Sequence, residues 1–124
     1  MIAYIEGEPG QAVVGSLLSN PTDVCYAHTI NLCEVYYQVA RRSGIHTAKA
    51  AIASLHMDGV IERRDMGRQF WQLVGDHKAR GGISLPDCFC ITLAQKLGGD
   101  VVTSDHGEFD PLVPLGIDPI TFIR

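Results

Sequence analysis

Long apolar runs, low-complexity segments and internal repeats are all missing from this chain of 124 residues. Its apolar stretches are too short to span a bilayer. The first ten residues have neither a basic segment nor a sustained apolar one, so we expect no secretory signal and a cytoplasmic location. With 46% apolar and 19% charged residues, the composition predicts a single folded domain over residues 1–124 rather than a disordered chain.

Cysteine is scarce, and its spacing excludes the common metal and redox motifs. The four cysteines are Cys25, Cys33, Cys88 and Cys90, and they follow neither a zinc-ribbon pattern nor C-x-x-C. All four lie on or beside apolar segments. We therefore predict buried, reduced thiols.

An overall excess of basic residues, which is typical of nucleic-acid-binding proteins, is also lacking, because the net charge is −4. The charge is nevertheless uneven along the chain. Residues 61–80 carry five basic side chains (Arg63, Arg64, Arg68, Lys78 and Arg80) against three acidic ones, a local charge of +2. Because the remaining acids could gather at a site that binds cations, the total charge does not exclude a polyanionic substrate.

Helical patterns alternate with short apolar segments along the chain. The spacing of apolar residues predicts helices over residues 2–7, 9–19, 29–43, 47–58, 67–80 and 85–97. Pro9 and Thr29 are placed to begin two of them. Phe70, Trp71 and Val74 are expected to face inward, the alternative for the two aromatic residues being a partner-binding surface. Short runs bounded by turn residues predict strands over residues 23–28, 60–66, 101–104 and 120–124.

Strands separated by helices predict βαβ units, and hence an α/β fold: a three-layer α/β/α sandwich with a parallel sheet. Such a fold normally begins with a strand, whereas this chain begins with a helix directly after Met1. We therefore expect the first central strand to be missing from the chain.

Three carboxylates follow the predicted strands at positions where α/β sheets bind ligands. Glu34 lies in the second turn after one strand, Asp87 in the first turn of a helix, and Asp105 directly after the strand that begins at residue 101. Grouped carboxylates repel one another unless a cation lies between them, and oxygen-only ligands favour Mg²⁺ or Mn²⁺ over zinc. Each acid also has a structural interpretation: a solvated helix face for Glu34, a helix cap for Asp87 and an Asx turn for Asp105.

These motifs resemble those of PIN-domain proteins, in the same order and over nearly the whole chain. "INLCEVYYQVAR" resembles the second acidic motif of that family, and "LPDCFCITLAQKLGGDVVTSD" resembles the third motif running into the fourth. "TSDHGEFDPL" is similar to the ending common in VapC-type toxins.

The resemblance implies an Mg²⁺- or Mn²⁺-dependent endoribonuclease, the toxin of a type II toxin–antitoxin system. It implies an RNA substrate, a cognate antitoxin and a homodimer, with Glu34, Asp87 and Asp105 as the catalytic, metal-binding carboxylates. Four further residues are given lesser roles: Glu108 as an auxiliary acid, Thr103 and Ser104 as hydrogen-bonding supports, and Asn31 as a residue that orients Glu34. His106 is considered as a base, although the family pattern does not require a histidine at this position.

The chain departs from the family pattern at its beginning. "IAYIEGEP" resembles the helix that follows the first acidic motif, which places that motif's strand and aspartate before Met1. An alternative function is therefore an N-terminally truncated, catalytically defective PIN domain that retains only antitoxin or partner binding. A third hypothesis is a receiver-like domain phosphorylated on Asp105. Arg63, Arg64, Lys78 and Arg80 are candidates for RNA backbone contacts, with a solvated surface as the alternative.

Overall fold

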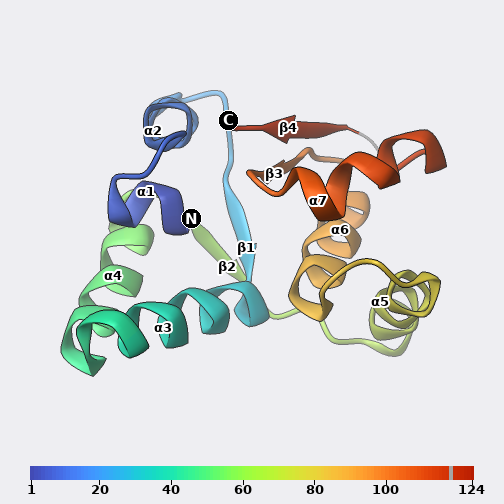
Figure 1. Ribbon diagram of the computed structural model, residues 1–124, viewed down its shortest axis with the longest axis horizontal. Coiled ribbons are helices and arrows are strands. Elements are labelled where there is room, and N and C mark those ends of the chain that lie inside the picture. The colour runs from blue at the N-terminus through green and yellow to red at the C-terminus, as the bar shows by residue number, and fades with distance from the viewer. Residues whose placement is uncertain (118) are drawn as a thin grey trace. The chain divides into compact units, whose positions relative to one another are not determined.

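The computed structural model describes residues 1–117 and 119–124, which form two compact units, Met1–Arg63 and Arg64–Arg124. Unit 1 and unit 2, as we call them, each have helices and a pair of strands (Figure 1). Among the described residues, no helix is both long enough and apolar enough to cross a membrane. The single domain expected from the composition stays a prediction.

Unit 1 begins with two helices and then forms a βααβ arrangement. Its elements are α1 (Ile2–Glu6), α2 (Gln11–Ser19), β1 (Tyr26–His28), α3 (Thr29–Ser43), α4 (Ile45–Met57) and β2 (Ile61–Arg63).

The core of unit 1 forms where α3 packs on α4. Val35 and Val39 on α3 and Ala48 and Leu55 on α4 are each less than 4% exposed, as their helical spacing requires. The strands β1 and β2 pair in parallel, with Ala27 opposite Glu62. The parallel pairing predicted from the alternation of strands and helices is confirmed for these two strands.

Unit 2 holds the remaining helices and the second strand pair. Its elements are α5 (Arg68–Arg80), α6 (Leu85–Leu97), β3 (Val101–Thr103), α7 (His106–Phe109), the 3₁₀-helix η1 (Asp110–Leu115) and β4 (Ile120–Phe122).

In unit 2, α5 packs on α6, with the Phe70 and Phe89 rings 6.0 Å apart. The strands β3 and β4 are parallel, with Val102 opposite Thr121. Phe109 on α7 is fully buried and anchors that short helix to the unit. The bounds predicted for α6 are confirmed, because Ser84 caps its beginning and Gly98 takes a left-handed conformation at its end.

The four predicted strands are all present, but within the described residues they form two separate two-stranded sheets. The α/β class and the parallel pairing are confirmed.

Several local predictions were wrong. His28, not Thr29, caps α3, because its Nδ1 accepts a hydrogen bond from Ile30 N at 3.1 Å. Pro9 lies in the turn before α2, which starts at Gln11. Trp71 is 49% exposed, since it points away from the face of α5 that buries Phe70.

The cysteines are all free, as predicted, but they are not all buried. Cys88 is buried, Cys25 and Cys90 are half-buried, and Cys33 is exposed on α3. Burial raises the pKa of the Cys88 thiol, which therefore remains protonated at neutral pH.

Candidate metal centre

Asp87 is held in the first turn of α6 by the residue that caps this helix. Ser84 Oγ accepts a hydrogen bond from Asp87 N at 3.2 Å and donates one to Asp87 Oδ2 at 2.7 Å. Ser84 thus fixes both the backbone and the carboxylate of Asp87. The N-terminal end of the helix also favours a negative charge at this position.

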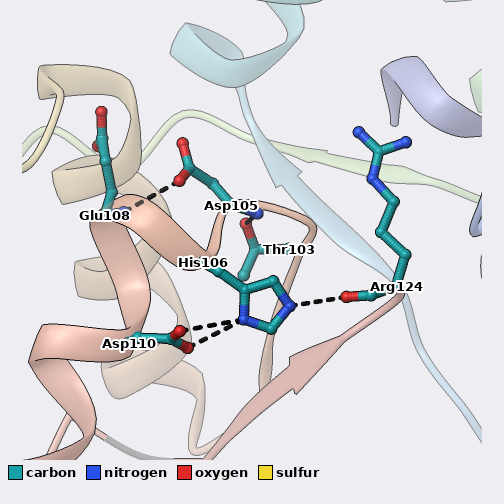
Figure 2. Close-up of polar contacts among 6 residues, drawn as sticks. All are labelled: Thr103, Asp105, His106, Glu108, Asp110 and Arg124. Carbon is teal, nitrogen blue, oxygen red and sulfur yellow. Dashed lines mark hydrogen bonds and ion pairs between the residues drawn. The ribbon is translucent and has the colours of Figure 1, made fainter.

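Asp105 caps the short helix α7 at the end of β3. Its Oδ1 accepts a hydrogen bond from Glu108 N at 2.9 Å, and its own N donates to Thr103 Oγ1 at 3.1 Å. A Cβ at Gly107 would lie 3.3 Å from Asp105 Oδ1, so a glycine suits the turn that this carboxylate caps. In Figure 2 the Asp105 and Glu108 carboxylates point to the same side of this turn.

Glu108 connects the two helix beginnings. Its Oε2 accepts a hydrogen bond from Ser84 N at 2.6 Å, while Ser84 Oγ contacts Asp87. One carboxylate oxygen from each of Asp87, Asp105 and Glu108 lies within 4.8 Å of the other two. The structure therefore brings together two of the predicted site residues, Asp87 and Asp105, with the auxiliary acid Glu108.

The donor set of this group fits a hard divalent cation. Asp87 and Glu108 are half-buried and Asp105 is exposed, so an ion could enter from solvent. All three offer oxygen ligands, which Mg²⁺ and Mn²⁺ prefer. When an ion binds two oxygens on opposite sides at about 2.1 Å each, these oxygens lie roughly 4 Å apart. The carboxylate oxygens of the group lie within 4.8 Å of one another, so small side-chain rotations would bring them to one ion.

Glu34 lies in unit 1, on α3, and is half-buried. Gln38 Nε2 donates a hydrogen bond to its Oε1 at 3.4 Å. Asn31, one turn earlier, is buried at 8% exposure. The metal-binding role of Glu34 and the orienting role of Asn31 stay predictions.

The residues given supporting roles differ in what they do. Thr103 accepts the hydrogen bond from Asp105 N, which agrees with its predicted role, whereas the role of Ser104 stays a prediction. Of the candidate RNA-binding cations, Lys78 donates a hydrogen bond to Ile83 O at 2.7 Å, and Arg80 is exposed at the end of α5.

His106 holds α7 to the end of β4. Its Nδ1 lies 3.0 Å from Asp110 Oδ1, and its Nε2 lies 2.7 Å from the backbone oxygen of Arg124 (Figure 2). Its ring stacks on Phe122, with the ring centroids 4.1 Å apart. Because both ring nitrogens face acceptors, both carry protons when these bonds are made. These contacts leave neither nitrogen available as the base considered above.

Sequence reasoning missed how Ser84 and Glu108 act. Ser84 was recognisable only as part of a helix-start signal, and its contact with the Asp87 carboxylate depends on a side-chain rotamer. Glu108 was recognisable from its place three residues after Asp105, a spacing that puts an acid in the first turn of a capped helix.

Comparison with known proteins identifies one family. The family model described as "PIN domain" matches residues 1–111, which include all three carboxylates of the group. No curated protein and no solved structure matches the chain.

The contact between Ser84 and Asp87 generates a prediction about metal affinity. Ser84→Ala removes the helix cap, which should lower the free energy of unfolding by about 1 kcal/mol. Because the Asp87 carboxylate then loses its hydroxyl donor, Mn²⁺ binding should weaken by about 10-fold or more. Urea denaturation and titration with Mn²⁺ measure the two effects. Ser84→Thr keeps the hydroxyl and is the control, and unchanged Mn²⁺ affinity in Ser84→Ala would contradict the assigned role.

The contacts of His106 generate a pH prediction. The Arg124 backbone oxygen, followed by the Asp110 carboxylate, raises the pKa of His106 above its ordinary value. Protonated His106 therefore stabilises the fold, and this stabilisation is complete below the unfolded-state pKa of about 6.5. The stabilisation is lost as the pH rises through the raised pKa of His106 in the folded protein. Asp110→Asn should reduce the pH dependence, as measured by urea denaturation in EDTA between about pH 6 and about pH 9. Identical pH profiles for the two proteins would refute the assignment.

Proposed function

The chain belongs to the PIN-domain family, and on that premise we propose that it is a ribonuclease that uses Mg²⁺ or Mn²⁺ to hydrolyse RNA phosphodiester bonds. PIN domains are generally nucleases. The observation that carries the proposal is the group of carboxylate oxygens of Asp87, Asp105 and Glu108 within 4.8 Å of one another.

Each of the three side chains has a distinct part in the proposal. Asp87, oriented by Ser84, and Asp105, oriented by its own helix cap, would hold the ion. Glu108 would add a ligand while its Oε2 accepts the hydrogen bond from Ser84 N. A bound ion of this type activates water and stabilises negative charge on the leaving oxygen.

The finer identity of the protein rests on the resemblance of its motifs. We propose a VapC-type toxin that acts in the cytoplasm, is neutralised by an antitoxin and forms homodimers, because "TSDHGEFDPL" is similar to the ending of such toxins. Glu34 belongs to this part of the proposal, since its motif resembles the second acidic motif of the family. The exposed Arg80 is a candidate contact for the RNA backbone.

Removal of one carboxylate tests the proposed function. Asp87→Asn should lower the rate of Mn²⁺-dependent cleavage of a labelled RNA by more than roughly 100-fold, because it removes charge from the ion's ligands rather than from a supporting group. Excess EDTA should stop cleavage by the unchanged protein. Asp76→Asn, which alters an exposed aspartate on α5, is the matched control and should cleave normally.

Two outcomes would argue against a metal-dependent nuclease. Cleavage that persists in EDTA, or that is equal in Asp87→Asn and in the unchanged protein, would show that the RNA is cut by something else. A folded protein that binds Mn²⁺ and cleaves no RNA would favour the alternative function, a defective PIN domain that only binds a partner.

A further inference from the structure

A pocket of about 240 Å³ lies in unit 2, and Glu108, one of the three grouped acids, is part of its lining. Residues from the end of α5, the loop after it, the beginning of α7 and η1 line it. Its apolar lining comes mainly from Ile83, Ile91, Leu112 and Ile117, which are at most 8% exposed. Such a concave, mainly apolar surface suits a flat organic group.

The pocket and the carboxylate group share a wall. Glu108 and its neighbour Gly107 line the pocket, and Glu108 also supplies one of the three grouped carboxylates. A substrate that places a phosphate at the carboxylates thus brings its adjoining chemical group to the pocket. In RNA the adjoining group is a nucleoside.

Polar groups at the pocket fit the edge of a base. His77 lines it and is only 7% exposed, with Nε2 3.0 Å from Gln95 Oε1. Because Gln95 Oε1 can only accept a hydrogen bond, His77 Nε2 carries the proton and Nδ1 is an acceptor. No residue in the described part of the chain donates a hydrogen bond to this Nδ1. Arg80 lines the pocket as well and is exposed.

One wall of the pocket is formed before any ligand binds. Gly81 and Gly82 have φ values of +82° and +73°, which allow the sharp turn after α5. Lys78 Nζ holds the far side of this turn through its hydrogen bond to Ile83 O at 2.7 Å. A wall fixed in this way reduces the ordering cost of binding.

We propose that this pocket binds the base of the nucleotide next to the cleaved phosphate and so sets the sequence preference of cleavage. The inference rests on the proposed ribonuclease function, since it takes RNA as the substrate. It assigns base contacts to the apolar lining and to His77, and leaves the phosphate to the carboxylates and their ion.

The first test measures binding to the full chain without metal or turnover. The four ribonucleosides, with ribose as the control that lacks a base, are titrated in EDTA and followed by NMR of the methyl groups. They carry no phosphate, so the three carboxylates do not repel them when the ion is absent. We expect the Leu112, Leu115 and Ile117 methyl signals to shift with at least one nucleoside and not with ribose. Shifts that are absent, that lie elsewhere, or that ribose reproduces would overturn the proposal.

A matched pair of substitutions on η1 adds a second test. Leu115 lines the pocket and is 62% exposed, whereas Val113 is 43% exposed and is not part of the lining. Leu115→Trp should fill the pocket opening and weaken nucleoside binding by about tenfold or more, while Val113→Trp should leave binding unchanged. Equal effects of the two substitutions would contradict the assignment.

Cleavage separates failure of this proposal from failure of the proposed function. In Mn²⁺, Leu115→Trp should change the ratio of cleavage rates among RNAs that differ in one base and leave Mn²⁺ affinity unaltered. Metal-dependent cleavage whose base preference is identical in Leu115→Trp would overturn the pocket proposal alone. Nucleoside binding at the pocket without any cleavage of RNA would overturn the proposed function and leave the binding site in place.

Discussion

Mutual repulsion of three carboxylates is the constraint on which the candidate site depends. Carboxylates that lie this close raise one another's energy unless donors or a cation offset their charge. The fold supplies part of that compensation: Glu108 N donates to Asp105 and Ser84 N donates to Glu108. The remaining negative charge lies where Asp87, Asp105 and Glu108 converge, which is the arrangement that a divalent cation stabilises.

Short-range contacts keep this arrangement in place. Phe109 buries one side of α7, and His106 ties the same helix to the end of β4 through the Arg124 backbone oxygen. Since Glu108 lies between these two residues, its carboxylate is positioned by packing on one side and by hydrogen bonds on the other. The same contacts hold part of the pocket wall in place, because Gly107 and Glu108 line the pocket.

Much of the local structure follows from the sequence, and its limits have physical causes. The bounds of α6 were predictable because Ser84 and Gly98 give local signals at its two ends. The short helix α7 and η1 were not predicted, since four to six residues carry too little periodicity to distinguish a helix from a loop. Trp71 was predicted to face inward because hydrophobicity alone does not distinguish it from its neighbour Phe70. Of these two aromatic residues, only Phe70 is buried.

The candidate site was predictable to the extent that it follows from the ends of strands. Asp105 follows β3 and Asp87 begins the helix before it, so sequence order alone placed them near one edge. The contribution of Glu108 and the contact between Ser84 and Asp87 depend on rotamers and on a turn between elements, which sequence patterns do not specify. The proposed metal centre is tested most directly by a crystal structure of the full chain grown with Mn²⁺, with the ion located by anomalous scattering. We expect a peak about 2.1 Å from carboxylate oxygens of Asp87 and Asp105, with Glu108 as a further ligand. A fully ordered site without such a peak at millimolar Mn²⁺ would contradict it.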